Sequence, residues 1–196
     1  MPNWETVTEF EKKIADYFGA PYAVAVDSCT HGIELCLRYA AAPQILCPNR
    51  TYLSIPMLAK KLNIDLLFND IEWVNYYEVW CNIIDAAVFW EKGGYLQGTF
   101  MCISFQYQKH LSLGRGGMIL CHNKEVADKL KKMSYDGRLP GIAWREQDID
   151  TMGYHYYMTP ETAQLGLDRL PAAIVTPPRI WSHNDYPDLT QMKIFK

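Results

Sequence analysis

The sequence predicts an α/β fold in which a mostly parallel sheet is flanked by helices. Short apolar runs of strand length alternate along the chain with amphipathic segments of helix length. Hydrophobic residues make up 49% of the chain and charged residues 21%, which is typical of a globular protein and not of a disordered one. A length of 196 residues is enough for one domain with its own core. Strands that alternate with helices favour parallel pairing and a sheet covered on both faces.

The first third of the chain contains three predicted helices and two predicted strands. Apolar residues recur every three or four positions from Trp4 to Phe18, which predicts a helix, and Gly19 and Pro21 follow as its stop signal. Pro43 ends the second helix. The predicted elements of this part are helix 4–18, strand 22–26, helix 33–41, strand 45–47 and helix 52–62.

The same pattern continues to residue 170 and then changes. Thr159 is the expected N-cap of the last helix, with Glu161 in its first turn. Beyond it, prolines alternate with aromatic residues, so we expect a tail that lies against the body or a partner subunit. We therefore divide the chain into an α/β domain, residues 1–170, and a proline-rich tail, residues 171–196. The predicted elements before the tail are strands 64–68, 82–87, 100–105 and 117–121 and helices 124–133 and 160–170.

Charge and hydropathy exclude several classes of function. The chain has 19 Lys and Arg against 22 Asp and Glu, a net charge of −3, and no basic stripe. A nucleic-acid-binding protein needs many phosphate-neutralising contacts, so neither nucleic acid nor an acidic membrane surface is an expected partner. The N-terminus lacks a secretory signal, and no stretch is apolar enough to span a bilayer. We expect a cytoplasmic protein.

Cysteine and histidine spacing does not indicate a metal site. The six cysteines lie singly within apolar segments, without a CxxC pair, and are expected to be buried, reduced thiols. The five histidines show neither HExxH nor His/Cys ligand spacing. We expect no bound metal.

A turn between a predicted strand and helix is a candidate anion site. It reads Asp27-Ser28-Cys29-Thr30-His31-Gly32, and its backbone N–H groups and two hydroxyls suit a phosphate at a helix N-terminus. It is not a GxGxxG motif, so a nicotinamide site is poorly supported. The alternative is that Ser28 or Thr30 only caps the helix.

Asp85 ends an otherwise apolar run, Asn82 to Ala87. A carboxylate buried there needs a cationic or hydrogen-bonding partner, and a protonated pyridine nitrogen would be one. The alternative is an aspartate that is exposed to water or caps the next turn.

Lys109 follows the strand 100–105 and precedes the glycine-rich segment 114–117. A lysine near cationic or apolar groups loses its proton more easily and becomes an imine-forming nucleophile. Ser104, five residues earlier, would offer a hydroxyl to the same pocket. The alternative is an ordinary solvated surface charge.

In chain order these segments resemble the DegT/StrS family of nucleotide-sugar aminotransferases. The turn at Ser28 is similar to the family's SGTAAL phosphate turn, and Asp85 falls on the aspartate of its EDAAQ motif. The block SFQYQKHLSLGRGG, residues 104–117, resembles SFxxxKxLxxGEGG. Residues 153–159 and 163–167 resemble the family's later GyNyRmtdiqAAlgl block. The likeness runs from about Phe10 to Leu170.

The resemblance implies a pyridoxal 5'-phosphate-dependent aminotransferase with the aspartate-aminotransferase-like fold. It implies that Lys109 is the Schiff-base lysine, that Asp85 holds the pyridine nitrogen and that Tyr52 stacks on the ring. The substrates implied are a nucleotide-linked keto-sugar and an amino-acid donor, glutamate, and the site is implied to lie in a homodimer. The further cofactor-binding residues implied are Ser28, Cys29, Thr30, Ser104 and His155.

The chain also departs from the family pattern. The stretch from Asp70 to Asp85 is short enough that a strand–helix unit is expected to be missing, as is the C-terminal small domain. Arg115 replaces the glutamate of GEGG, and His155 and Tyr157 replace the Asn and Arg of GyNyR. Two alternatives therefore stay open: a catalytically impaired pyridoxal-phosphate-binding or structural remnant of the family, and a sugar- or nucleotide-binding module without cofactor.

Overall fold

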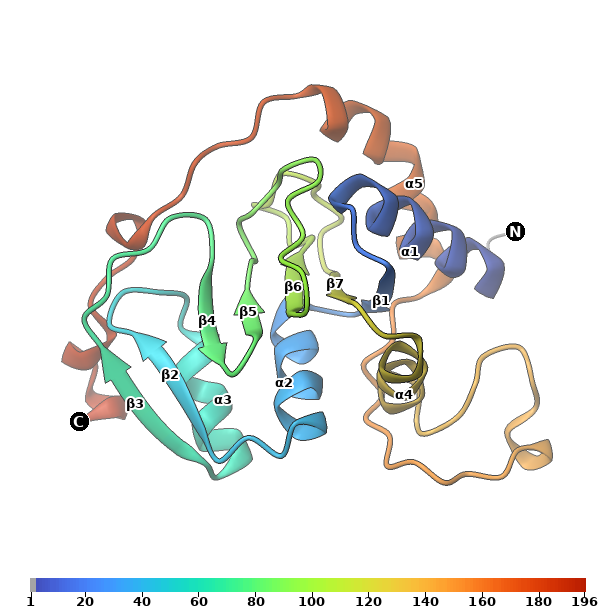
Figure 1. The fold of residues 1–196 in the computed structure, drawn as a ribbon, viewed down its shortest axis with the longest axis horizontal. Helices are drawn as coiled ribbons and strands as arrows, with labels where there is room; N and C mark the ends of the chain where they lie inside the picture. Colours follow the sequence, from blue (N-terminus) through green and yellow to red (C-terminus); the bar gives the residue numbers. More distant parts are fainter. Residues whose placement is uncertain (1–2) are drawn as a thin grey trace.

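A computed structural model describes residues 3–196 of the chain (Figure 1). Within this range the helices are α1 Trp4–Phe18, α2 Cys29–Tyr39, α3 Ser54–Leu62, α4 Lys124–Ser134 and α5 Pro160–Val175. The strands are β1 Tyr22–Val26, β2 Gln44–Pro48, β3 Asp65–Asn69, β4 Tyr77–Trp80, β5 Ile83–Asp85, β6 Phe100–Ser104 and β7 Gly117–Cys121. In the part of the chain that the structure describes, no helix is long and apolar enough to cross a membrane.

The central sheet is mixed and has the strand order β1-β7-β6-β5-β4, whereas β2 and β3 form a separate parallel pair. The α/β class is confirmed, and β1, β5 and β6 run in one direction as predicted. Parallel pairing does not dominate the central sheet, because β7 and β4 are reversed and the β1–β7, β6–β7 and β4–β5 pairs are antiparallel. The chain passes from β4 to β5 and from β6 to β7 without a crossover helix. Parallel neighbours need such a crossover, so these neighbouring strands are antiparallel.

β4 is a strand that the sequence analysis did not predict. It forms a hairpin with β5 through the two-residue turn Cys81–Asn82, in which both residues have positive φ, 24° and 65°. Such turns match the twist of a hairpin, but they are normally signalled by Asn-Gly or Asp-Gly. Cys81 is exposed in this turn, so the prediction of six buried thiols is wrong at this position. The other five cysteines are buried and free, as predicted.

Alternate residues of the central strands pack against two different groups of helices. Ile119 of β7 belongs to a core shared with α2, α3 and α4. Its neighbours Met118 and Leu120 point to the opposite core, which α1 and α5 cover. Figure 1 shows α1 and α5 lying together on one side of the sheet. The prediction of a sheet covered on both faces is therefore confirmed.

The helix ends at Gly19 and Thr159 follow the predicted signals, whereas α2 begins at Cys29, four residues before its predicted start, and α5 ends later than predicted. Gly19 ends α1 in the left-handed conformation, and Thr159 caps α5 by accepting a hydrogen bond from the Thr162 N–H. However, α5 continues beyond Leu170, through Pro171, to Val175. Proline removes one N–H but has a helical φ, and Ala173 is buried against the α1/α5 core, so packing offsets the lost hydrogen bond.

The residues after α5 cross the open edge of the protein as an extended strap (Figure 1). Single β-bridges join Val74 to Ser182 and Arg50 to Asp188. Leu189 is almost fully buried, and its N–H donates to the Asn49 carbonyl over 2.8 Å. In this structure the tail thus lies against the body of its own chain. The division into two domains at residue 170 stays a prediction.

Candidate active site

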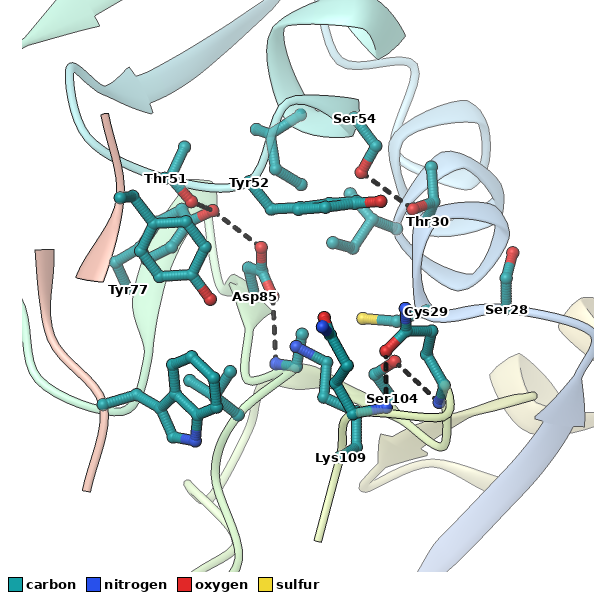
Figure 2. A pocket seen from close by; sticks show the side chains of 18 of the residues that line it. Ser28, Cys29, Thr30, Thr51, Tyr52, Ser54, Tyr77, Asp85, Ser104 and Lys109 are labelled. Carbon is teal, nitrogen blue, oxygen red and sulfur yellow. Dashed lines mark hydrogen bonds between the residues drawn. The ribbon is translucent and has the colours of Figure 1, made fainter. Parts of the chain in front are cut away.

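A cavity of about 510 Å³ opens where α2 begins and where β5 and β6 end. Figure 2 shows Lys109 and Asp85 directed into this space, with the Tyr52 ring across it. Of the eight predicted site residues, the structure brings seven together on its wall: Ser28, Cys29, Thr30, Tyr52, Asp85, Ser104 and Lys109. We call these seven residues the sheet wall.

Lys109 lies in the loop that follows β6, and its backbone N–H donates to the Gln106 carbonyl. Its ammonium forms no ion pair with a carboxylate among residues 3–196, and it lies 5.6 Å from the centre of the Trp181 ring. Burial lowers the pKa of Lys109, although the charges of Asp85 and Cys29 oppose part of this shift. A lysine with a lowered pKa supplies more neutral amine, which is the nucleophilic form.

Asp85 ends β5 and is almost fully buried. Its Oδ2 accepts a hydrogen bond from the Tyr77 hydroxyl over 2.6 Å, and its Oδ1 accepts one from the Ala87 N–H over 3.0 Å. Burial raises the pKa of Asp85, whereas these hydrogen bonds and Lys109 lower it in part. The alternative interpretation of Asp85 is thus correct in one part only: the carboxylate does cap the turn at Ala87, but it is not exposed to water.

Tyr77 and Thr51 are site residues that sequence reasoning missed. The Tyr77 hydroxyl lies 2.5 Å from the Thr51 Oγ1, so the two side chains and Asp85 form one buried hydrogen-bonded chain. Burial raises the pKa of Tyr77 well above its usual range, so it is a neutral donor to Asp85. No signal for this role exists in the sequence, because it depends on the β4–β5 hairpin placing Tyr77 opposite Asp85.

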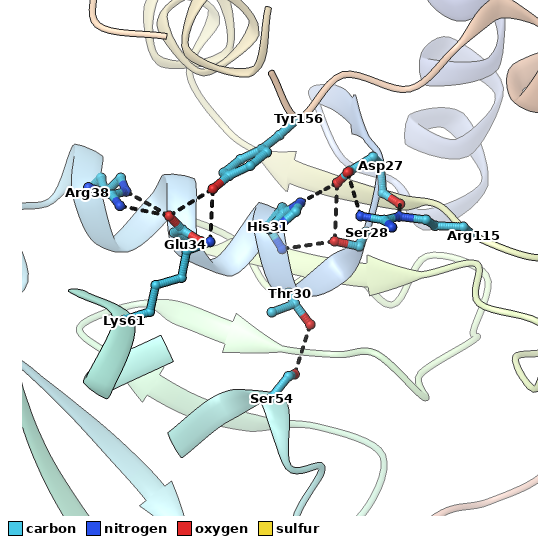
Figure 3. A network of polar contacts seen from close by, with 10 residues as sticks. All are labelled: Asp27, Ser28, Thr30, His31, Glu34, Arg38, Ser54, Lys61, Arg115 and Tyr156. Carbon is cyan, nitrogen blue, oxygen red and sulfur yellow. Dashed lines mark hydrogen bonds and ion pairs between the residues drawn. The ribbon is translucent and has the colours of Figure 1, made fainter. Parts of the chain in front are cut away.

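The first turn of α2 forms the end of the cavity opposite Tyr77. Ser28 is the N-cap, and its Oγ accepts a hydrogen bond from the His31 N–H, so the capping alternative describes part of its role. Thr30 Oγ1 lies 2.8 Å from Ser54 Oγ, which joins α2 to α3 (Figure 3). Cys29 is buried, and burial raises its pKa well above the usual range, so it lines the cavity as a neutral thiol.

Arg115 brings a cation to the same end of the cavity. Its guanidinium donates to Asp27 Oδ2 over 2.8 Å, and Asp27 Oδ1 lies 2.6 Å from His31 Nδ1 (Figure 3). The arginine that replaces the glutamate of the family motif is therefore held by the residue before the α2 cap. An anion bound at the α2 N-terminus would meet both the backbone N–H groups and this charge.

β7 begins with a glycine, Gly117, because no larger residue fits at this position. A Cβ at this position would lie 2.4 Å from the Cys29 backbone N and 2.5 Å from the Ser28 carbonyl carbon. Only glycine lets β7 approach the α2 cap this closely.

The outer side of the cavity is formed by the tail. Trp181, Asp185 and Tyr186 line it, and we call these residues, with Arg179 beside them, the tail wall. Trp181 is held on both sides by Asn75: its N–H donates to Asn75 Oδ1, and its carbonyl accepts from the Asn75 N–H. The sequence predicted that an aromatic, proline-rich tail would lie against the body or a partner subunit. It did not predict that the tail would line this cavity.

His155 is the predicted site residue that does not line the cavity. Its ring is exposed and pairs with Asp136, with Nδ1 3.0 Å from Oδ2. A role for His155 in cofactor binding stays a prediction.

Solved structures with the same fold include sugar aminotransferases. AtS13 from Actinomadura melliaura superposes with a TM-score of 0.76 at 21% identity, covering 88% of this chain and 61% of AtS13. The sugar aminotransferase CalS13 from Micromonospora echinospora gives 0.72 at 15% identity, covering 86% and 60%. The PLP form of Spr1654 from Streptococcus pneumoniae gives 0.70 at 19% identity, covering 85% and 60%. The fold is thus that of the pyridoxal-phosphate-dependent aminotransferases of fold type I.

The sequence itself matches one family over most of its length. Residues 2–89 and 91–174 match the DegT/DnrJ/EryC1/StrS aminotransferase family, and the chain belongs to this family. The spore coat polysaccharide biosynthesis protein SpsC of Bacillus subtilis is 25% identical, and the uncharacterized protein MJ1066 of Methanocaldococcus jannaschii is 26% identical. Each alignment covers 84% of this chain and 56% of the relative. The chain therefore spans little more than half the length of these relatives.

Proposed function

We propose that the chain binds pyridoxal phosphate in this cavity and transfers an amino group from an amino acid, glutamate, to a nucleotide-linked keto-sugar. One observation carries the proposal: Lys109 and Asp85 are both withdrawn from water on one cavity, and neither forms an ion pair within residues 3–196. A buried acid and a half-buried amine without ion-pair partners are costly, and such groups gather at functional sites.

The residues present fit this cofactor from end to end. Asp85 would hold a proton at the ring nitrogen, because a cation there gives the buried carboxylate the charged partner it lacks. The α2 N–H groups, with Ser28, Thr30 and Ser104, would bind the phosphate, and Arg115, which is paired with Asp27, would offer a further donor at that end. Tyr52 lies across the space and would cover one face of the ring.

Lys109 would perform the proton transfers. When bound, pyridoxal phosphate supplies an electrophilic carbonyl and an electron-withdrawing ring. The neutral amine of Lys109 would hold the cofactor through its carbonyl carbon. Once the donor amine takes that place, Nζ would accept a proton from the donor carbon and deliver it to the cofactor, so that the amino group stays on the cofactor. The lowered pKa of Lys109 favours both steps, because each needs the unprotonated amine.

The substrate class is proposed from the relatives and not from the cavity alone. CalS13 is a sugar aminotransferase and SpsC is a polysaccharide biosynthesis protein, which supports a sugar as the amino acceptor. We further propose a homodimer, the assembly that the family resemblance implies.

The first experiment records the visible absorption spectrum of the purified chain with pyridoxal phosphate, beside the variant Lys109→Ala. Borohydride should trap the cofactor on the wild type as a mass increase, and Lys109→Ala should show none. Lys92→Ala, which removes an exposed lysine, is the matched control and should behave as the wild type. If the wild type shows no absorption band and no mass increase, the cofactor proposal is wrong.

A glutamate pulse then separates the two functions that share this site. Discharge of the visible band by glutamate supports the aminotransferase. A band that glutamate cannot discharge supports the second candidate, a catalytically impaired cofactor-binding remnant. That candidate is favoured by one observation: His155 and Tyr157 stand where the family motif has Asn and Arg.

A further inference from the structure

A second cavity, of about 420 Å³, lies beside the first. Both open onto the same lysine, because the residues that they share are Ala87, Val88, Ser104, Gln108, Lys109 and Trp181. The second cavity does not include the first turn of α2, where a phosphate would bind. It is therefore a further chamber of the same site, and a molecule in it would reach Lys109 away from the phosphate end.

The lining of the second chamber is cationic and aromatic. Lys109 and Arg179 are its charged side chains, and no aspartate or glutamate lines it among the described residues. Trp90 and Trp181 form apolar surfaces, and His110 lies between them and α5, with Nε2 2.8 Å from the Ala173 carbonyl. Such a chamber suits a small anion with an aliphatic body.

Arg179 is held in place by the tail. Its guanidinium carbon lies 3.9 Å from the centre of the Trp181 ring, and one amino group pairs with Asp185 Oδ1. The other oxygen of Asp185 accepts from the Ser182 N–H, so the carboxylate binds Arg179 through a single oxygen. A guanidinium has five donors in a planar fork, which leaves donors for a second carboxylate.

We propose that Arg179 binds a carboxylate of the amino donor in this second chamber. The inference rests on the proposed function, because the donor must present its amine at Lys109. It assigns to the tail a direct part in substrate binding: the tail brings the cation, Trp181 orients it and Asp185 balances its charge. Asp185 would then share Arg179 with the bound carboxylate.

The test measures glutarate binding to the cofactor-free protein by calorimetry. Glutarate has the two carboxylates of glutamate at the same spacing but no amine, so it reports binding without reaction. Arg179→Gln should weaken binding about 10-fold or more, because it removes a charge-assisted, bidentate contact. Arg145→Gln, which changes an exposed arginine elsewhere, should change it less than about 2-fold.

A second variant moves the affinity in the opposite direction. Asp185→Asn removes the competing charge from Arg179 but keeps an oxygen for the Ser182 N–H, so glutarate should bind several-fold more tightly. Glutarate binding that Arg179→Gln leaves unchanged, or no glutarate binding to the wild type, overturns the inference. Borohydride trapping of pyridoxal phosphate on Lys109 should survive in Arg179→Gln, so failure here is distinguishable from failure of the proposed function.

Discussion

Two walls meet at Lys109, and they are built from different kinds of contact. The sheet wall consists of residues at the start of α2, at the ends of β5 and β6 and in the loops before α3 and after β6. It is held by the ladders of β5, β6 and β7 and by two apolar cores. The tail wall is an extended strap fixed by single bridges and by one buried leucine. A wall embedded in a sheet can hold a cofactor rigidly, whereas a strap can yield to a substrate. The difference agrees with the proposed division of roles, in which the sheet wall binds the cofactor and the tail wall binds the substrate.

The largest expected effect comes from Gly117, which packs against the backbone of two sheet-wall residues, Ser28 and Cys29. Gly117→Ala places a methyl group 2.4 Å from the Cys29 backbone N, and backbone cannot move aside as a flexible side chain would. The free energy of unfolding should fall by about 3 kcal/mol or more, measured by urea denaturation. Gly98→Ala is the control, because its Cβ would meet nothing within 4 Å and only its positive φ is strained. Equal losses in the two variants would contradict the close approach of β7 to the α2 cap.

A substitution in the tail should loosen the tail wall and leave the sheet wall intact. Leu189→Ala removes the buried anchor of the strap and should cost about 2 to 3 kcal/mol locally. Hydrogen exchange should then quicken at the Leu189 N–H, which donates to Asn49, but not in β7. Leu120→Ala, a buried leucine of β7, should instead quicken exchange throughout the sheet. If Leu189→Ala also exposes β7, the two walls unfold together and the comparison fails.

The sequence predicts the sheet wall better than the tail wall, because the sheet wall is built from local features of the chain. Strand ends and helix starts are local features, so the turn at Ser28, the aspartate that ends β5 and the lysine after β6 could all be singled out as site candidates from short segments. The tail wall depends on Asn75 meeting Trp181, two residues more than a hundred positions apart. Tyr77 was missed because β4 is four residues long and its turn contains Cys81, a residue that does not signal positive φ. Patterns within a short segment predict local structure, whereas the pairing of distant residues leaves no pattern in a short segment.

Tyr77 joins the two walls, because it donates to Asp85 and packs 5.1 Å from Trp73, which in turn packs against Tyr186. Tyr77→Phe keeps the packing but removes a hydrogen bond that lowers the pKa of Asp85. The pKa of Asp85 should rise, so more of the carboxyl is protonated at low pH. Pyridoxal phosphate should therefore bind about 10-fold more weakly at pH 5.5 and nearer to wild type at pH 8, measured by absorption titration. A loss that is the same at both pH values would contradict this account.

The smallest expected effect concerns Asp85. It tests whether burying this carboxylate in the sheet wall lowers the stability of the protein. The pKa of Asp85 is raised in the folded protein, so the folded state holds its proton longer than the unfolded chain, whose value is 3.8. The stability that Asp85 contributes is thus fully present below pH 3.8 and is lost as the pH rises through the raised value. Asp85→Asn removes this loss, and at pH 7 it should raise the free energy of unfolding by about 1 kcal/mol. The gain should shrink as the pH approaches 3.8, and the variant should no longer hold pyridoxal phosphate tightly. A variant less stable at pH 7 than the wild type would mean that the hydrogen bonds from Tyr77 and Ala87 outweigh the cost of burying the charge.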